Sequence, residues 1–338
     1  MRTSKRDLAA VCAKYSGFTD LLGLLPTQPI LLVLNHHRIG NAYACEYDSE
    51  TFSATGDELD NQIRFLKRRW HLATLEEAVE IAERKIKLKR AVVLITFDDG
   101  YLDNYELAFK ILSSHGVQGV FFLPTSFIGS NRTTWWDMIA FIIKASGLRA
   151  FELNYPSVHH FDIEGQGVQR IIRQALDLYQ SSAVTDGERF IAALEEACGQ
   201  PRPDGRQRCF MNWTEAAEMV RGGMAIGSHT HRHEILAKLS AEEQIEELVT
   251  SKQLLETHLK VPVHAVAYPV GLPESFSSVT RAAAEQAQYR VGFSFYGGFN
   301  IAGNIERYNI RRVSVFNSTA ARFGLQTTLA VVTGKYWL

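Results

Sequence analysis

The chain has 338 residues, of which 46% are apolar and 22% are charged, and its formal net charge is −1. This length accommodates one large α/β domain or two ordinary domains. The balanced charge gives no electrostatic support for nucleic-acid binding. Four scattered cysteines without a CxxC pair indicate neither a thiolate zinc site nor a disulfide framework, so we expect a cytoplasmic protein.

An N-terminal helical arm is expected over residues 1–28, with an amphipathic segment from Leu8 to Leu25. Lys14 interrupts the apolar stretch, which favours mature protein over a signal peptide. No run approaches the roughly 18 apolar residues that a membrane span requires. Basic residues nearby would allow peripheral contact with a membrane, but packing against the main domain is the interpretation that we favour.

Seven short apolar runs, separated mainly by helical patterns, are expected to form buried strands. They are Ile30–Leu34, Ala91–Phe97, Val117–Leu123, Met224–Gly227, Val263–Tyr268, Val291–Phe295 and Ile310–Val315. Successive parallel strands need helical crossovers, and closing seven of them produces a barrel whose active site lies at the C-terminal strand ends. We therefore expect an α/β barrel over residues 29–128 and 209–330.

The alternation of strands and helices is interrupted between residues 129 and 208. Helical patterns at Val168–Gln180 and Glu188–Cys198, without strong strand alternation, predict an insertion of helices and loops after the third strand, covering the barrel mouth as a substrate cap. Trp136 and Asp137 lie near its start. An aromatic face that stacks on sugar rings, beside an acid, makes them candidate substrate-binding residues, although a buried anchor explains them equally well.

Chemically unusual residues fall at the predicted C-terminal strand ends. The second strand leads into two adjacent carboxylates, Asp98 and Asp99, which repel each other and usually need a cation or a proton between them. After the fourth strand, His229 and His233 are four positions apart, so both imidazoles can reach one ion if the segment turns helically. Together with Asp99 they would suit Zn²⁺ or another divalent transition metal, with positions left for water and substrate.

These side chains fit a hydrolytic reaction. We expect Asp98 to be the base that takes a proton from metal-bound water, while the metal polarises a carbonyl oxygen. The reaction would be hydrolysis of an amide or an ester. For His231, between the two expected ligands, a hydrogen-bonding or solvent-facing role is favoured over ligation.

The segments Thr96–Gly100 (TFDDG) and His229–His233 (HTHRH) resemble the first two motifs of the polysaccharide deacetylase family, also called NodB-homology or carbohydrate esterase family 4 proteins. The resemblance implies a distorted (β/α)7 barrel and a divalent metal, often zinc. It gives Asp98 and the three metal ligands the roles stated above. The implied enzyme is a metal-dependent carbohydrate deacetylase, an amide hydrolase that acts on an acylated amino sugar or glycan precursor.

The segment Ala267–Gly271 resembles a variant of the third family motif, which shapes the substrate groove. The resemblance makes Tyr268, Pro269 and Val270 substrate-binding residues, with the backbone N–H of Val270 directed to the oxyanion. Two family features are missing. The arginine that commonly opens this motif is not evident, and the late Leu-x-His motif that usually supplies the general acid is absent, since no histidine follows His264.

Residues near the first and last strands are candidates to replace these features. His36 and His37 follow the first strand in a segment that resembles a YHR-like feature of some relatives, and we favour His37 as the general acid. A structural histidine in the barrel mouth explains His37 as well. Arg311 or Arg312 would replace the arginine, although a surface salt bridge is the favoured interpretation for these two residues.

Two other functions remain open at this point. An N-formyl sugar deformylase would use the same hydrolytic groups, with only the size of the acyl pocket changed. A catalytically inactive carbohydrate-binding relative would explain the missing acid and arginine. The retained base and complete set of three metal ligands favour the enzyme.

Overall fold

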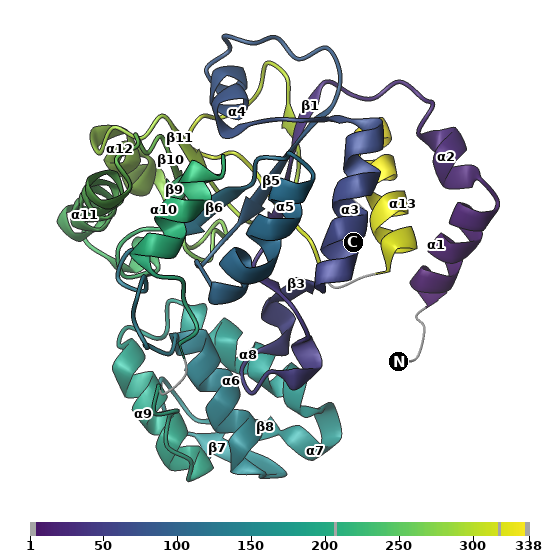
Figure 1. Cartoon of the computed structure of the whole chain (residues 1–338). Helices are drawn as coiled ribbons and strands as arrows, with labels where there is room; N and C mark the ends of the chain where they lie inside the picture. The colour runs from purple at the N-terminus through teal and green to yellow at the C-terminus, as the bar shows by residue number, and fades with distance from the viewer. Residues whose placement is uncertain (1–4, 206–207, 317–318, 335–338) are drawn as a thin grey trace. The chain divides into compact units, whose positions relative to one another are not determined.

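The computed structural model describes residues 5–205, 208–316 and 319–334 (Figure 1). Residues 1–4 of the expected N-terminal arm lie outside this part. Contacts divide the chain into two compact units, which are described separately. The first unit is Met1–Gly40, Phe52–Gly129 and Phe210–Leu338, and the second is Asn41–Thr51 and Ser130–Cys209.

The first unit is built on a curled sheet of parallel strands. Six of them pair in the order β1 (Ile30–His36), β5 (Val92–Phe97), β6 (Val120–Leu123), β9 (Ala225–Ser228), β10 (Ala265–Ala267) and β11 (Val291–Phe293). The segment that contains β13 (Val313–Ser314) lies between the two ends of this series. Its Ile310 bridges Phe293 of β11, and its Val313 pairs with Leu34 of β1, both in parallel. The predicted seven-stranded, distorted barrel is thereby confirmed.

Side chains alternate along the strands and form two apolar layers. The inward-facing layer packs on α4 (Leu75–Ala82) and includes Leu31, Val33, Leu94, Val120, Phe122, Ala265, Ala267, Val291, Phe293 and Ile310. The outward-facing layer lies beneath the outer helices and includes Leu32, Leu34, Val93, Ile95, Phe97, Phe121, Leu123 and Val266. Because both faces are buried, the strands appear in the sequence as continuous apolar runs.

The outer helices are α3 (Gly56–Arg69), α5 (Lys110–Ser114), α10 (Trp213–Arg221), α11 (Ala241–Leu259), α12 (Ser278–Gln286) and α13 (Ala320–Thr333) (Figure 1). Local sequence signals start several of them. Thr55, Thr74, Asn212 and Ser240 each form a capping box with the glutamate three residues later. At the N-terminus, α1 (Lys5–Tyr15) and α2 (Phe18–Leu22) pack on α13.

The second unit contains α6 (Trp135–Ser146), β7 (Ala150–Leu153), β8 (His159–Asp162), α7 (Ile163–Gln166), α8 (Val168–Gln180) and α9 (Gly187–Cys198). Helices α8 and α9 match the two helical patterns of the sequence. The antiparallel pair β7–β8 was not expected, because its alternation of buried and exposed residues extends over only four positions in each strand. Residues 41–51 join this unit through Asp48, which accepts a hydrogen bond of 2.8 Å from Gln169.

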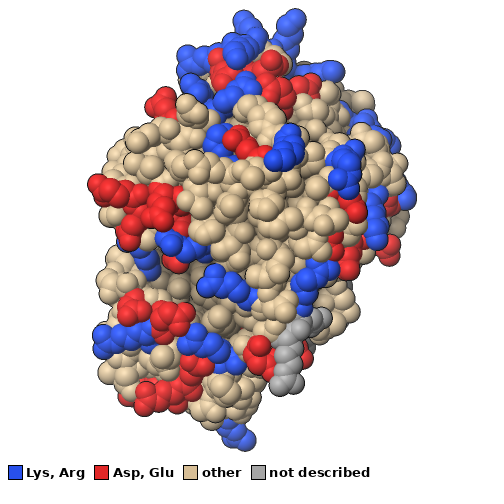
Figure 2. Space-filling model, turned by 60° about the vertical axis from the view of Figure 1, so that its left-hand side comes forward, with Lys and Arg blue, Asp and Glu red and all other residues tan. Residues whose placement is uncertain are grey.

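Acidic and basic side chains are interspersed over the face shown in Figure 2, with a broad uncharged area between them. This distribution agrees with the small net charge of the chain. That face therefore does not present the continuous basic surface that a nucleic-acid backbone would require.

Close packing inside the barrel leads to a stability prediction. An alanine Cβ at Gly227 would lie 2.4 Å from the ring of Phe122 and 3.2 Å from the carbonyl oxygen of Ala265. We expect Gly227→Ala to lower the free energy of unfolding by about 1–3 kcal/mol, because overpacking forces the neighbours to move. Urea denaturation of the purified protein measures this change.

Gly56→Ala is the matched control for this substitution. Its Cβ would make an ordinary contact of 3.7 Å with Ile111 at the start of α3. Its unfolding midpoint should stay unchanged or rise slightly. Equal midpoints for Gly227→Ala and the unmodified chain would contradict tight packing at the centre of the barrel.

Candidate active site

The site lies at the C-terminal ends of the barrel strands, where the backbone adopts unusual conformations. Of the seven non-glycine residues with positive φ among those described, four are found here: Asp99 (73°), Thr230 (64°), His233 (60°) and Val270 (62°). A left-handed conformation is unfavourable for residues with a Cβ, and it persists where surrounding structure enforces it. Such clustering is typical of functional sites.

Asp99, His229 and His233 come together as the sequence predicts. Their candidate ligand atoms all lie within 4.8 Å of one another, and all three side chains are buried. The Oδ1 atom of Asp99 lies 3.4 Å from Nε2 of His229 and 3.3 Å from Nε2 of His233. Burial raises the pKa of Asp99, but hydrogen bonds with the two imidazoles outweigh burial and hold the pKa well below its usual range.

The donor set fits a divalent transition metal. The Nδ1 atom of His229 lies 2.8 Å from the carbonyl oxygen of Ala267, which can only accept a hydrogen bond. This contact assigns a proton to Nδ1, so in the neutral imidazole, as a metal ligand must be, Nε2 carries the lone pair on the side of Asp99. Two imidazole nitrogens and one carboxylate oxygen form a three-ligand set of the kind found in catalytic zinc sites.

Asp98 occupies a separate, fully buried network beside this donor set. Its Oδ1 accepts a hydrogen bond of 2.7 Å from Nη1 of Arg312, and its Oδ2 accepts one of 3.0 Å from Nδ2 of Asn35. Burial raises the pKa of Asp98, but the charge of Arg312, followed by that of His229, outweighs burial and lowers the pKa. The carboxylate is therefore ionised at neutral pH, as a general base must be.

The barrel holds Arg312 in place on several sides. Its Nε donates to the carbonyl oxygen of Ser294 at 3.0 Å, and Nη1 also donates to Oδ1 of Asn35 at 2.8 Å. The guanidinium lies over the ring of Phe122, 5.4 Å from its centroid. The expectation of a surface salt bridge is wrong for Arg312, because the side chain is fully buried and pairs with Asp98.

Sequence reasoning missed Asn35 and gave Arg312 the less favoured role. The signal that could have found both residues is the alternation of inward-facing and outward-facing side chains along a strand. Asn35 lies two residues after the inward-facing Val33, and Arg312 lies two residues after the inward-facing Ile310. A polar side chain at an inward position near a C-terminal strand end is directed to the barrel mouth.

The two consecutive histidines after Asn35 have different surroundings. His36 faces outward, where its ring stacks on Phe97 with centroids 4.9 Å apart, and burial lowers its pKa to about 4. The ring of His37 is partly exposed and lies 5.4 Å from the ring of Phe295. Its positive form would lower the pKa of both Asp98 and Asp99, which places His37 within electrostatic reach of the site.

The segment after β10 turns sharply at the barrel mouth. The Tyr268 side chain is buried in the outward-facing layer, where its hydroxyl donates to the carbonyl oxygen of Tyr308 at 3.1 Å. Pro269 accepts a hydrogen bond of 2.6 Å from the N–H of Gly271, which places Val270 at the tip of the turn. Tyr268 thus anchors the segment, and substrate contact by Pro269 and Val270 stays a prediction.

Trp136 and Asp137 belong to the second unit, and both side chains are buried there. The Trp136 ring lies edge-on to Trp135, with centroids 5.1 Å apart. Asp137 accepts a hydrogen bond of 3.4 Å from the N–H of Asp48. These contacts correspond to the anchor interpretation of the sequence, and a role in substrate binding stays a prediction.

The loop between the two histidine ligands is braced from α11. Glu247 is buried, and its Oε2 accepts hydrogen bonds from the N–H groups of His231 (2.9 Å) and Arg232 (2.7 Å). Its Oε1 pairs with Nε of Arg232 at 2.7 Å. The Nδ1 atom of His231 lies 2.8 Å from Oγ1 of Thr125, so His231 has the expected hydrogen-bonding role outside the donor set.

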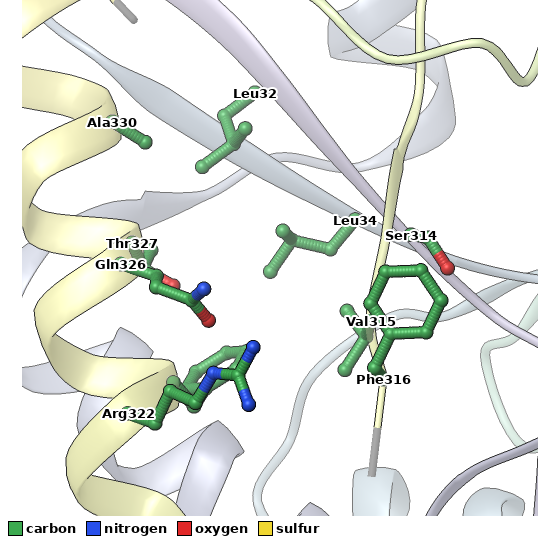
Figure 3. Close-up of a pocket in the computed structure, with 10 residues that line it drawn as sticks. Leu32, Leu34, Ser314, Val315, Phe316, Arg322, Gln326, Thr327 and Ala330 are labelled. Carbon is green, nitrogen blue, oxygen red and sulfur yellow. The ribbon is translucent and has the colours of Figure 1, made fainter. Parts of the chain in front are cut away.

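A narrow apolar crevice lies outside the barrel, between α13 and the strands β1 and β13 (Figure 3). Leu32 and Leu34 of β1 point into it from one side, and Arg322 and Gln326 of α13 border the other. None of the residues that line it belongs to the donor set or to the Asp98 network. The crevice is therefore separate from the candidate active site.

The fold and the site together define an α/β barrel with a candidate three-ligand metal centre beside a buried carboxylate. The model of the polysaccharide deacetylase family matches residues 85–292, which is more than half of the chain. The chain belongs to the polysaccharide deacetylase family. The matched region contains Asp98, Asp99, His229 and His233.

Individual relatives agree with this membership. The putative polysaccharide deacetylase YxkH of Bacillus subtilis is 23% identical over 263 residues, covering 78% of this chain and 63% of the relative. The Streptococcus pyogenes deacetylase PplD, solved in complex with acetate, has 17% identity and a TM-score of 0.56 over 90% of this chain and 99% of its own. IcaB from Ammonifex degensii has 18% identity and a TM-score of 0.55, and the match covers 88% of this chain and 97% of IcaB. The two structural likenesses show a shared fold.

The brace under the histidine loop leads to a metal-affinity prediction. In Glu247→Ala, the N–H groups of His231 and Arg232 lose their acceptor, so the loop no longer holds the two imidazoles in one arrangement. We expect Zn²⁺ affinity to fall about 10- to 100-fold, as is usual when an outer partner of a metal site is removed. Competition with a chromophoric chelator measures the dissociation constant.

Two further variants make this measurement specific. Glu247→Gln keeps an acceptor oxygen for the two N–H groups and should lose less affinity than the alanine variant. Glu246→Ala removes the neighbouring, exposed carboxylate of the same helix and should leave the affinity unchanged. Equal Zn²⁺ affinity in Glu247→Ala and Glu246→Ala would show that the brace does not act on the metal centre.

Proposed function

We propose that the chain is a metal-dependent deacetylase that removes an N-acetyl group from a sugar or glycan precursor. One observation carries the proposal: a donor set of Asp99, His229 and His233 lies directly beside the ionised, hydrogen-bonded Asp98. Family membership supports deacetylation of a carbohydrate. The proposed compartment is the cytoplasm, in line with four cysteines that are all free thiols.

Asp99, His229 and His233 would hold the divalent cation, and Zn²⁺ suits their nitrogen and oxygen donors best. Bound there, the cation would polarise the acyl carbonyl and lower the pKa of the attacking water. All three side chains are buried at the C-terminal ends of the barrel strands.

Asp98 is proposed to remove the proton from the attacking water. Its Oδ2 faces the donor set, 3.8 Å from Nε2 of His229, whereas its Oδ1 is directed toward Arg312 at 2.7 Å. Arg312 and Asn35 thus fix the orientation of the carboxylate and leave one oxygen toward the reacting centre. The same contacts keep the base ionised before each turnover.

Two groups at the barrel mouth would complete the reaction. The N–H of Val270, at the tip of the turn after β10, is proposed to stabilise the oxyanion of the tetrahedral intermediate. His37 is proposed to donate a proton to the leaving amine. Its backbone is held in place on both sides, because its N–H donates to Oγ of Ser53 at 3.0 Å and its carbonyl oxygen accepts from Asn104 at 2.7 Å.

The acetyl group is preferred over the formyl group as the substrate acyl. The solved structural neighbours include deacetylases, one of them in complex with acetate. The Asp98 network disfavours the alternative of an inactive carbohydrate-binding relative. A protein that only binds sugars has no use for a buried, ionised carboxylate with one oxygen facing the donor set, because burying a charge is costly.

The role of Asp98 leads to an activity prediction. Asp98→Asn keeps the size of the side chain and a contact for Arg312 but removes the proton acceptor. We expect kcat for acetate release from N-acetylated chitooligosaccharides to fall about 10²- to 10⁴-fold. Bound Zn²⁺, measured by elemental analysis, should remain, because Asp98 is outside the donor set.

The outcome distinguishes the three candidate functions. Release of formate but not acetate from matched N-acyl sugars would favour the deformylase. A Zn²⁺-loaded chain that binds the sugars and releases neither acid, with or without the substitution, would favour the binding protein. Undiminished acetate release by Asp98→Asn would exclude Asp98 as the base.

The proposed acid can be tested by the choice of leaving group. An amine must be protonated as it departs, whereas 4-nitrophenolate leaves without a proton. His37→Gln should therefore lower the rate of N-acetyl sugar hydrolysis about 10²- to 10⁴-fold while largely sparing hydrolysis of 4-nitrophenyl acetate.

His264→Gln is the control for this comparison, because His264 precedes β10 at the opposite end of the barrel. Both of its rates should match those of the unmodified chain. If His37→Gln slows both substrates to the same extent, His37 has a structural role and another group donates the proton.

A further inference from the structure

The stretch of chain that follows Asp98 and Asp99 turns back onto the strand end that carries His37. It leads into η3 (Asn104–Phe109), which is a π-helix instead of an α-helix. Turns of π-helix are rare, and they are frequent at functional sites. One short stretch therefore carries the proposed base, one of the metal ligands and the first residue of a π-helix.

Asn104 connects this stretch directly to His37. Its side chain is fully buried, and its Nδ2 donates a hydrogen bond of 2.7 Å to the carbonyl oxygen of His37. The same Nδ2 also donates to Oδ1 of Asp103 at 3.0 Å. Breaking a hydrogen bond between buried groups leaves an acceptor without a partner and without water, which costs free energy. The carbonyl group of His37 is therefore held in one place.

Asp103 holds the two residues that follow His37. Its Oδ1 accepts a hydrogen bond of 3.0 Å from the N–H of Ile39, and its Oδ2 accepts one of 2.9 Å from Nε of Arg38. The guanidinium carbon of Arg38 lies over two aromatic rings, 4.4 Å from the centroid of Phe52 and 4.6 Å from that of Tyr101. These contacts keep the ion pair of Asp103 and Arg38 in one arrangement.

The backbone of His37 is also tied to β5 and β3 (Phe52–Ala54). The N–H of Asp98 donates to the carbonyl oxygen of His36 at 3.0 Å. The N–H of His37 donates at 3.0 Å to Oγ of Ser53, which is buried in β3. Rotation of the side chain is the freedom left to His37, and its ring packs against Phe295 with centroids 5.4 Å apart.

We propose that Asp103 and Asn104 are positioning residues that fix His37 relative to Asp98. The inference rests on the proposed function, in which His37 protonates the leaving amine. Asn104 acts through the backbone of His37, and Asp103 acts through Asn104 and the N–H of Ile39. One short stretch thus sets the spacing between the group that removes a proton and the group that supplies one. Such spacing matters, because a misplacement of about 1 Å can cost about 10²-fold in rate.

A role in stability alone accounts poorly for Asn104. Its Oδ1 is buried and has no hydrogen-bond partner among the described residues. An apolar side chain of similar size would occupy the same space without the cost of this unsatisfied acceptor. The contacts that offset the cost are those of Nδ2, and they converge on His37 and Asp103.

The rates of the Zn²⁺-loaded full chain on two substrates test the role in catalysis. We expect Asn104→Ala to lower kcat for N-acetyl sugar hydrolysis about 10- to 100-fold and largely to spare 4-nitrophenyl acetate, whose leaving group needs no proton. Asp103→Ala should act in the same direction. Asn104→Ala combined with His37→Gln should be no slower on the sugar than His37→Gln alone, because the two residues act as a unit.

A second measurement reports the position of His37 without any reaction. The NMR signal of its ring Cε1–H, in a chain with isotope-labelled histidine, is identified by its loss in His37→Gln. This signal should shift and broaden in Asn104→Ala, because the backbone that carries the ring is released.

Asn300→Ala is the matched control for both measurements. Asn300 is also a buried asparagine, and its Nδ2 donates to the carbonyl oxygens of Leu31 (3.0 Å) and Arg311 (2.8 Å), near the N-terminal end of β1. Even where its unfolding midpoint falls, the ratio of the two rates and the signal of His37 should match those of the unmodified chain.

Three outcomes would overturn the proposal, and they differ from one another. An unchanged His37 signal in Asn104→Ala would show that Asn104 does not hold His37. A shifted signal with both substrates slowed to the same extent would reduce Asn104 to a structural role. An unmodified chain that hydrolyses the ester but no N-acetyl sugar would exclude the proposed deacetylation itself, and the positioning role in that reaction with it.

Discussion

Two ionised carboxylates lie buried side by side at the end of β5, and the residues around them balance their charge. Burial and mutual repulsion would otherwise favour a protonated acid. Arg312 balances Asp98, and two imidazoles surround Asp99 at the place where a cation would bind. Removing one partner of a buried ion pair typically costs about 3–5 kcal/mol. Strands from opposite ends of the barrel sequence therefore have to meet at this one point.

Much of this arrangement could be predicted because it depends on local patterns. Parallel strands that are buried on both faces appear as continuous apolar runs, so all seven were found in the sequence. Their C-terminal ends share one edge, which brings Asp99 near His229 and His233 without any knowledge of loop conformation. The resemblance to the family motifs predicts the same three residues independently of the strand-end argument.

The rest depended on contacts between distant parts of the chain. The strand that contains Arg312 was predicted, but the inward-facing position of Arg312 within that strand was not considered. The residue was therefore interpreted as a surface residue. His36 and His37 are consecutive in the sequence but have different environments. The difference follows from the alternation of side chains along the strand, because Asn35 faces inward and His36 therefore faces outward. The association of Asp48 with Gln169 has no local signal at all, since 121 positions separate the two residues.

The pairing of Asp98 with Arg312 also sets the moment at which the site forms during synthesis. The two residues are 214 positions apart, and the segment that contains Arg312 closes the barrel between β11 and β1. A nascent chain that has not yet placed this segment leaves two sheet edges open and the base without its cation. The proposed chemistry therefore begins only after the last strand is in place, so a ribosome-bound chain still lacking it would be inert toward any acylated sugar.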